Sequence, residues 1–197
     1  MKRSIYKTIF AAAVLFFFSG CVFADGGAVV SIDPASSTIS VGGTATFDVD
    51  ISGVTDLYGY QFDVLFGPST VSATSESEGG FLATGGTTFF IPGTIDNVGG
   101  SVTATADTLI GAIAGVDGSG TLAVLTFTGL APGTTSIDLE NVFLLDSSFN
   151  SIDFTTQDAS LTVQGGVTPA PEPSDLLLLG MGLMGVVGLA RRKVAAV

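Results

Sequence analysis

The chain has 197 residues, of which 18 are acidic and 6 are basic, and its formal net charge is −12. All six basic residues lie near the two ends, and no Lys, Arg or His occurs between Asp25 and Asp175. This central polyanion excludes nucleic acid as a partner, because binding to phosphates requires cationic side chains. Its length fits a single domain of ordinary size.

Residues 1–24 predict a secretory signal peptide. A basic start is followed by an uncharged apolar run at residues 8–18, which is too short to span a membrane as a helix. The small side chain of Ala24 favours cleavage between Ala24 and Asp25. Two alternatives stay open: the residues before Cys21, the single cysteine, resemble a lipoprotein box, and an uncleaved segment would serve as an anchor.

Residues 25–164 predict one all-β domain. Short runs rich in Val, Ile, Thr and Phe recur between clusters of Gly, Asn, Asp and Pro, and helix signals are nearly absent. Nine strands are expected, at residues 29–33, 38–41, 44–52, 57–66, 87–91, 101–109, 121–128, 135–145 and 159–164. This number of short strands favours a β-sandwich or a jelly roll.

Two of these strands alternate between apolar and polar side chains, which predicts one buried face and one wet face for each. The side chains expected in the core are Phe47, Val49, Ile51, Tyr58, Tyr60, Phe62, Val64 and Phe66. Leu57 and Leu65 fall on the wet side of the second strand. From the polar sides we select a candidate partner face that consists of Asp48, Asp50, Gln61 and Asp63.

The predicted all-β domain resembles a cohesin-type domain. The likeness extends over residues 28–164 and is carried by the runs at 41–44, 49–54, 57–62, 66–68, 118–127 and 132–139. The resemblance implies a nine-stranded jelly-roll sandwich, related to carbohydrate-binding modules, that binds a dockerin module through one sheet face.

Two departures from the cohesin pattern concern the partner. Gly67 precedes Pro68 where the family usually has Asp. Gly59 and Gln61 stand at positions where the best-known members carry an Asn and an Asp on the strand that contacts dockerin. A fold can be shared without its partner, so the ligand stays open between a dockerin-like protein and a polysaccharide.

The residue types of the body argue against an enzyme. Residues 25–164 contain no His, Cys, Lys or Arg, so neither Ser-His-Asp nor Cys-His catalysis can be assembled. A glycosidase needs two carboxylates at a defined separation, and no specific pair stands out. We therefore expect a non-enzymatic protein, with a carboxylate hydrolase as the alternative.

Ligand-binding signals in the body are few. Acid-rich loops such as residues 146–153 offer oxygen ligands for a structural calcium ion, although their spacing is not that of an EF-hand. No other cofactor is expected, and the metal question stays open. A sugar site usually rests on exposed aromatic rings, but the chain has no Trp, and Tyr58 and Tyr60 fall on the core side.

The C-terminal end has three parts in a fixed order. Residues 165–174 form a Gly/Pro-rich linker that ends in Pro171, Glu172, Pro173 and Ser174. Residues 175–197 contain an uncharged run at 176–190 and then Arg191, Arg192 and Lys193. As a helix, this run spans roughly 22 Å against a hydrocarbon core of about 30 Å, so it predicts a marginal membrane anchor. The basic stop predicts a cytoplasmic C-terminus.

This order of motif, apolar run and basic tail resembles the PEP-CTERM sorting signal of bacteria that make exopolysaccharide. The resemblance implies recognition and cleavage by an exosortase, a membrane enzyme that acts near the Pro-Glu-Pro motif. An ordinary single-span anchor is the alternative. We therefore predict an exported, non-enzymatic protein of the cell envelope or extracellular matrix, associated with exopolysaccharide or biofilm. A binding module for a dockerin-like protein or a polysaccharide is the alternative function.

Overall fold

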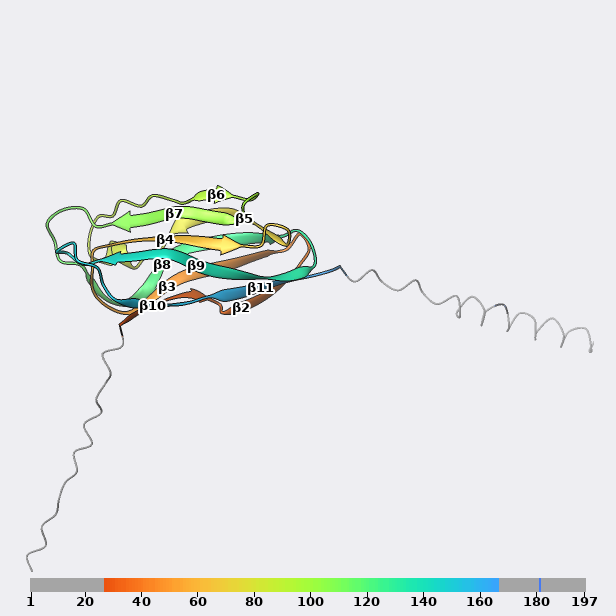
Figure 1. Cartoon of the computed structure of the whole chain (residues 1–197), viewed down its shortest axis with the longest axis horizontal. Coiled ribbons are helices and arrows are strands. Elements are labelled where there is room, and N and C mark those ends of the chain that lie inside the picture. Colours follow the sequence, from red (N-terminus) through yellow and green to blue (C-terminus); the bar gives the residue numbers. More distant parts are fainter. Residues whose placement is uncertain (1–26, 167–180, 182–197) are drawn as a thin grey trace, which may run out of the picture.

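Two β-sheets face each other in the computed structural model, which describes residues 27–166 and Met181 (Figure 1). The strands are β1 (Ala28–Asp33), β2 (Ser36–Ser40), β3 (Thr44–Leu57), β4 (Gly59–Phe66), β5 (Val71–Glu78), β6 (Thr94–Asp96), β7 (Ser101–Thr108), β8 (Val116–Gly129), β9 (Gly133–Leu145), β10 (Phe154–Gln157) and β11 (Ala159–Gln164). A 3-10 turn, η1 (Leu82–Thr84), follows β5, and residues 27–166 contain no α-helix. The predicted all-β sandwich is confirmed.

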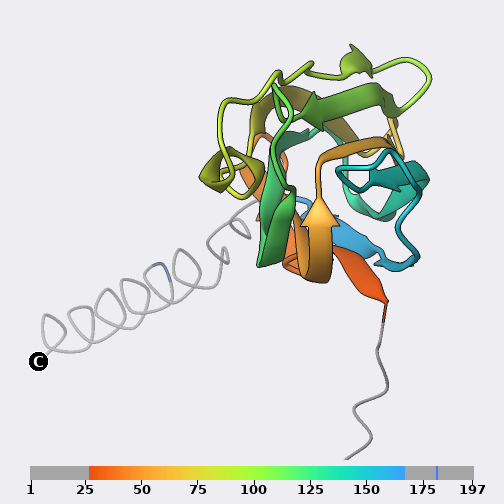
Figure 2. The ribbon, with the colours of Figure 1, turned by 90° about the vertical axis from the view of Figure 1, so that its left-hand side faces the viewer.

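The two sheets differ in size and in the strands at their centres. The five-stranded sheet has the order β10-β1-β3-β8-β5, and the six-stranded sheet has the order β2-β11-β9-β4-β7-β6. Only the β1/β10 and β2/β11 pairs are parallel. Figure 2 looks at the sandwich from one end and shows the two layers on either side of the core. The strand β4 lies between β9 and β7, in the middle of the six-stranded sheet.

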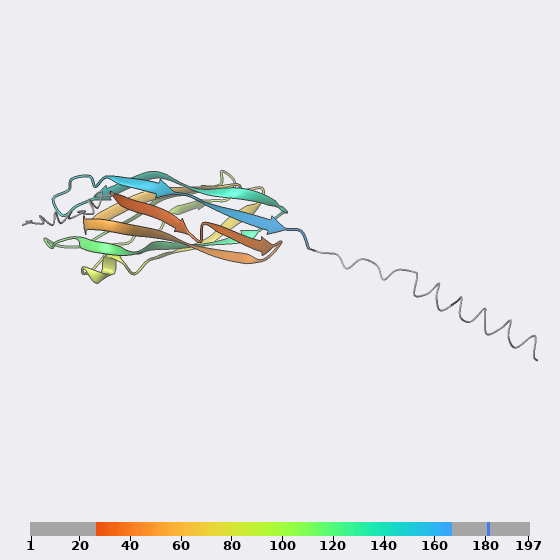
Figure 3. The same cartoon turned by 90° about the horizontal axis from the view of Figure 1, so that it is seen from below.

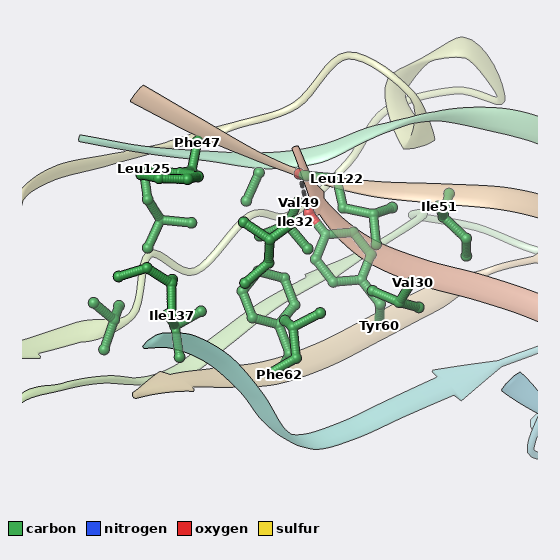
Figure 4. Close-up of a cluster of buried hydrophobic side chains, with 14 of the residues drawn as sticks. Val30, Ile32, Phe47, Val49, Ile51, Tyr60, Phe62, Leu122, Leu125 and Ile137 are labelled. Atoms are coloured by element: carbon green, nitrogen blue, oxygen red, sulfur yellow. Dashed lines mark hydrogen bonds between the residues drawn. The ribbon is translucent and has the colours of Figure 1, made fainter. Parts of the chain in front are cut away.

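Apolar side chains from both sheets fill the space between the layers (Figure 4). Phe127 packs edge-to-face against Phe47 and Phe66, with ring centroids 5.9 and 5.3 Å apart. Such pairs stabilise a core beyond the area that they bury. The Tyr60 hydroxyl crosses between the sheets and donates a hydrogen bond of 2.5 Å to the Leu122 carbonyl. All eight side chains predicted to face the core are buried.

The structure has eleven strands, so the count of nine is not confirmed. The missed strand β5 buries only Val71 and Ala73, and its second half is rich in Ser and Glu because it forms a sheet edge. The strands β6 and β10 are too short to give a hydrophobic pattern. The expected strand at residues 87–91 makes only isolated bridges at Thr88 and Ile91.

Leu57 is buried, whereas the alternation placed it on the wet side. It is the last residue of β3, and Tyr58 separates it from β4. The two strands belong to different sheets, so one alternating pattern cannot continue across the crossing.

The described domain begins and ends at opposite ends of the sandwich (Figures 1 and 3). Gly27 lies against Asp153, next to the end where β3 finishes. Gln164 lies at the other end, where its carbonyl accepts a hydrogen bond from Val41 N. The connection towards the Pro-Glu-Pro motif therefore leaves the domain at the end remote from its start.

Several predictions concern residues outside the part that the structure describes. These are the signal peptide with its Ala24–Asp25 junction, Cys21, the motif from Pro171 to Ser174, the apolar run at 176–190 and the basic stop from Arg191 to Lys193. Among the described residues, no helix is long and apolar enough to cross a membrane.

Candidate functional site

A groove of about 300 Å³ lies on the outer face of the six-stranded sheet. Its floor consists of two rows of residues that run across β9, β4 and β7, so the register of the sheet defines it. The first row is Phe143, Gln61 and Ala106, and the second row is Leu145, Gly59 and Thr108. We call this hollow the outer groove.

One wall of the outer groove comes from the connection between η1 and β6. Phe89 and Ile91 line the groove from this segment. The Phe89 amide donates to the Thr108 carbonyl at 2.8 Å, and the Ile91 amide donates to the Ala106 carbonyl at 2.7 Å. Residues 88–91 thus extend the sheet beside β7, although they form no regular strand.

The outer groove is apolar where a solvated sheet face would be polar. Phe143 is 49% exposed, Phe89 is 59% exposed and Ile91 is 47% exposed. Leu65, on the same face of β4, is 40% exposed, in agreement with its predicted wet position. Contiguous exposed apolar side chains of this kind mark interaction sites more often than single exposed ones.

Gly59 leaves the floor of the outer groove free of a side chain at its position. A Cβ atom at this position would lie 3.2 Å from the Asp107 carbonyl oxygen and 3.3 Å from Thr108 Oγ1. Both contacts are tight, so a larger residue would push against β7.

Two β-bulges decide which side chains line the outer groove. In β9, residues 141 and 142 stand opposite one residue of β4, and this shift turns Phe143 outward. In β7, residues 103 and 104 stand opposite Asp63, and this shift turns Thr105 and Asp107 inward. A bulge changes the face of every residue that follows it.

Three acidic side chains of β5 and β7 lie near the wall of the outer groove, one buried, one half-buried and one exposed. Asp107 of β7 is only 3% exposed, and its Oδ1 accepts a hydrogen bond of 2.8 Å from Thr108 N. Glu76 of β5 accepts hydrogen bonds from Thr105 Oγ1 at 2.6 Å and from Gly93 N at 2.5 Å. Glu78 of β5 accepts one from Thr88 Oγ1 at 2.6 Å. We call these residues the inter-sheet carboxylates.

Burial dominates the electrostatics of Asp107 and Glu76. It raises the pKa of Asp107 to about 6, with a further contribution from the charge of Glu78. It also raises the pKa of Glu76, against the lowering effect of the bonds from Thr105 and Gly93. Asp107 and Glu76 therefore bind protons more readily than exposed carboxyls do.

The residues selected as a partner face lie on opposite sides of the sandwich. Asp48 and Asp50 belong to β3 in the five-stranded sheet, whereas Gln61 and Asp63 belong to β4 in the six-stranded sheet. Only Gln61 lines the outer groove. Asp48 stands opposite Asp33 of β1, and its pKa is raised by burial and by the charges of Asp50 and Asp33.

A second hollow, of about 610 Å³, lies at the end of the sandwich where the domain begins. Tyr58, Ser147 and residues 111–114 line it, together with Phe149, which is 70% exposed. The Phe149 ring stands edge-to-face on Tyr58, with centroids 5.6 Å apart. We call it the end hollow.

The loop chosen as a calcium candidate uses its first acidic side chain internally. Asp146 accepts hydrogen bonds from the amides of Ser148 and Asn150 and from the Asn150 side chain. Within the described residues, no group of three or more Asp, Glu, His or Cys side chains is placed to hold a metal ion.

Comparison with known proteins supports both resemblances. Residues 169–193 match the PEP-CTERM protein-sorting motif, which implies export and membrane-linked sorting. No curated protein sequence matches this chain.

The described domain is similar to solved cohesins. A non-cellulosomal cohesin from the archaeon Archaeoglobus fulgidus has a TM-score of 0.56 and 13% identity, over 71% of this chain and 92% of that one. The third ScaC cohesin of Acetivibrio cellulolyticus, in complex with the ScaB dockerin, has a TM-score of 0.56 and 18% identity, over 69% and 98%. The Coh-OlpA–Doc918 complex of Clostridium thermocellum has a TM-score of 0.58 and 11% identity, over 71% and 100%.

The fold is cohesin-like. Identities this low establish the shared fold and do not transfer a partner. The neighbours are described as cohesins, several of them in complex with dockerins, and the expectation of a non-enzymatic protein stays a prediction for this chain. Of the residues that line the outer groove, the sequence pointed to Gln61 and Gly59 as candidate contact positions, but not to Phe143 or Ile91. Phe143 follows a bulge that the alternating pattern does not signal.

Proposed function

We propose that this protein is an exported interaction module of the cell envelope whose outer groove binds a partner protein. The observation that carries the proposal is the apolar lining of the groove by Phe143, Phe89 and Ile91 on an otherwise acidic domain. Buried aromatic side chains supply most of the affinity of protein interfaces.

The charge of the domain supports a basic partner surface. Of the 18 acidic residues, only Asp25, Glu172 and Asp175 lie outside residues 27–166, and no basic residue lies inside this range. A partner with Lys or Arg around an apolar contact would be steered to the groove, and a second copy of this chain would be repelled.

The cohesin-like fold supports the choice of face. In the resemblance seen from the sequence, the strand that contacts dockerin corresponds to β4, which forms the middle of the outer groove. Complexes with dockerins are described for several structural neighbours. Because Gly59 and Gln61 replace the usual Asn and Asp, the proposed partner is a protein other than a classical dockerin.

The sorting and processing of the chain are also proposals. The match at residues 169–193 supports recognition by an exosortase-type enzyme and cleavage near Pro171 to Ser174. We further propose that the signal peptide is removed between Ala24 and Asp25. The apolar run and the stop from Arg191 to Lys193 would hold the chain in the inner membrane, with a cytoplasmic C-terminus, until processing in an exopolysaccharide-associated envelope.

A capture experiment tests the function. The mature chain is cross-linked on the surface of the cells that produce it and is then purified together with the proteins cross-linked to it. Phe143→Ala, Phe89→Ala and Phe149→Ala variants are treated in parallel. The first two substitutions should reduce recovery of the partner by about tenfold or more, as for interface hot spots. Phe149→Ala changes an exposed aromatic ring in the end hollow and is the matched control.

The same experiment distinguishes the remaining ligands. Purified matrix polysaccharide is offered to each variant in a second arm. Saturable binding that depends on Phe149 and not on Phe143 would contradict the proposal and move the site to the end hollow. A defined protein that is captured equally by all variants would contradict the choice of the outer groove.

A further inference from the structure

Exposed apolar side chains gather at the end of the sandwich where the domain begins. Ile110 is 54% exposed, Ile113 is 39% exposed and Phe149 is 70% exposed. Residues 110–114 contain no polar side chain, and most of this run lines the end hollow together with Phe149. We call Ile110, Ile113 and Phe149 the apolar tip. Contiguous exposed apolar side chains of this kind mark interaction sites.

One carboxylate holds the two loops of the apolar tip side by side. Asp56 accepts hydrogen bonds from the Gly115 amide at 2.6 Å and from the Ser147 hydroxyl at 2.7 Å. Gly115 directly follows the run at 110–114, and Ser147 lies two residues before Phe149. The domain itself therefore preorganises the tip, which lowers the entropic cost of binding.

The backbone at Phe149 has a conformation that bulky residues rarely adopt. Its φ angle is 63°, in the left-handed region that favours glycine. The Phe149 amide donates to the Asp146 carbonyl at 3.0 Å, and the Asp146 carboxylate accepts the amides of Ser148 and Asn150. These bonds keep an aromatic ring exposed on a strained backbone. Both features disfavour folding, and strain of this kind is found mainly at functional positions.

The polar groups around the apolar tip do not fit a sugar or an anion. Two hydroxyl side chains line the end hollow, and both are used within the domain. Tyr58 donates to the Gly111 carbonyl at 2.6 Å. Ser147 donates to Asp56. A sugar site needs free polar side chains that orient the ligand, and residues 27–166 contain no basic side chain for an anion. The tip therefore offers apolar contact alone, which suits hydrocarbon.

The N-terminal connection brings this end of the domain close to a membrane. The domain begins at the end that carries the apolar tip, and its C-terminal connection leaves from the other end (Figure 1). Residues 19–26 separate Gly27 from the apolar run of the predicted signal peptide, and they span at most about 30 Å. A lipid on Cys21, the alternative at this end, would lie closer still. A bilayer that holds the N-terminal segment is therefore within reach of the tip.

We propose that the apolar tip docks on the surface of a zwitterionic lipid bilayer. Residues 111–114 form no helix or strand, so their backbone groups restrict the tip to the hydrated interfacial layer. The negative charge of the domain opposes docking on anionic lipid. Three side chains give weak, reversible attachment by themselves, and the N-terminal segment strengthens it for as long as it is present. This inference does not rest on the outer groove.

Tryptophan fluorescence tests the docking, because the chain contains no Trp. Phe149→Trp places a single indole ring at the apolar tip, and Phe143→Trp places one in the outer groove as the matched control. The mature chain of each variant is mixed with phosphatidylcholine vesicles whose acyl chains carry bromine, which quenches indole fluorescence on contact. The C-terminal run brings both variants to the vesicles equally. We expect quenching by about half or more for Phe149→Trp and by less than about a tenth for Phe143→Trp.

Several results would overturn the lipid assignment. Absence of quenching in Phe149→Trp would exclude docking by the tip, and equal quenching in both variants would show unspecific contact with the vesicle. Stronger quenching in vesicles that contain phosphatidylglycerol would contradict the role of charge. Capture of a protein or a polysaccharide that is lost in Phe149→Ala would assign the tip to that ligand. The quenching data do not alter the prediction for Phe143→Ala, so the tip and the groove are tested separately.

Discussion

Asp63 accepts a hydrogen bond from the Asn141 side chain at 2.7 Å, across the boundary between β4 and β9. Its other oxygen accepts the Ala104 amide of β7 at 2.7 Å. Asn141 and Ala104 each lie at a bulge and have positive φ angles of 49° and 61°. One carboxylate thus holds both irregular positions that turn Phe143 outward and Asp107 inward.

Replacement of Asp63 should therefore disturb the groove as well as the stability of the fold. We expect Asp63→Ala to lower the free energy of unfolding by about 1–2 kcal/mol, because two hydrogen bonds to a charged acceptor are lost at a partly solvated site. Denaturant unfolding measures this value, with Glu140→Ala as the control on the neighbouring strand. Equal stabilities of the two variants would show that the bulges do not need Asp63.

The stability of the chain should fall as the pH rises from about 4 to above 6. The pKa of Asp107 increases from 3.8 in the unfolded chain to about 6 in the folded one, so the folded state binds the proton more tightly. The stability that Asp107 contributes is complete below its pKa in the unfolded chain, and it is lost as the pH rises through its pKa in the folded chain. The shift of Glu76 has the same direction.

Asp107→Asn should remove most of this dependence. The full shift corresponds to at most about 3 kcal/mol, and solvent entering from the groove reduces the expected gain at neutral pH to about 1–2 kcal/mol. Thermal unfolding of both chains over the pH range measures the effect. If the stability of Asp107→Asn depended more steeply on pH than that of the wild type, the assignment of this dependence to Asp107 would be contradicted.

The contribution of Asp56 to stability should depend on pH in the direction opposite to that of Asp107. Its pKa is lowered, chiefly by the hydrogen bond from the Ser147 hydroxyl at 2.7 Å and then by the Gly115 amide at 2.6 Å. Stability from this group is present above its usual pKa and is lost as the pH falls through the lower folded value. In Asp56→Asn, which keeps a residue suited to the φ of 58°, the loop at residues 146–150 should exchange faster at neutral pH.

The hydroxyl of Tyr60 should matter less than its ring. Tyr60→Phe removes the hydrogen bond to the Leu122 carbonyl, which still accepts the Gly79 amide at 2.8 Å. We expect a loss of about 1 kcal/mol, because no buried acceptor is left without a donor. Phe127→Ala, which removes a fully buried ring, should cost about 3–5 kcal/mol in the same unfolding experiment.

The intact mass of the surface-located protein tests the sorting proposal. Cleavage near Pro171 to Ser174 would remove the apolar run and the stop at Arg191 to Lys193. Loss of residues 1–24 should appear in the same spectrum. A mature species that still contains Val197 would refute the processing and leave a simple membrane anchor.

The sequence predicted the parts of the fold that depend on regular alternation. Phe47, Val49 and Ile51 were predicted correctly as core, because the side chains of β3 alternate without a break here and the extra residue at the β3/β8 irregularity lies in β8. The groove was harder to predict, because Phe143 follows a bulge at which Asn141 is hydrogen-bonded to Asp63 of another strand. Continuing the pattern of Ile137 and Leu139 would have placed Phe143 inside.

The placement of the polar residues depended on the sheet topology, which alternation does not contain. Asp50 and Gln61 are eleven positions apart along neighbouring strands of the chain, yet these strands lie in different sheets. A wet face was predicted correctly for each strand, but the two wet faces point away from each other. Long-range pairing decides this, and no local signal reports it.

The separation of Gly27 and Gln164 at opposite ends of the sandwich sets the orientation of a tethered domain (Figure 3). A molecule that is attached through its C-terminal connection projects the Tyr58 and Phe149 end outward and carries the outer groove along its flank. A ligand must then approach from the side, between neighbouring molecules. The density of the tethered molecules would thereby limit the fraction of outer grooves that hold a ligand. Closely spaced molecules would bind less ligand per molecule than widely spaced ones.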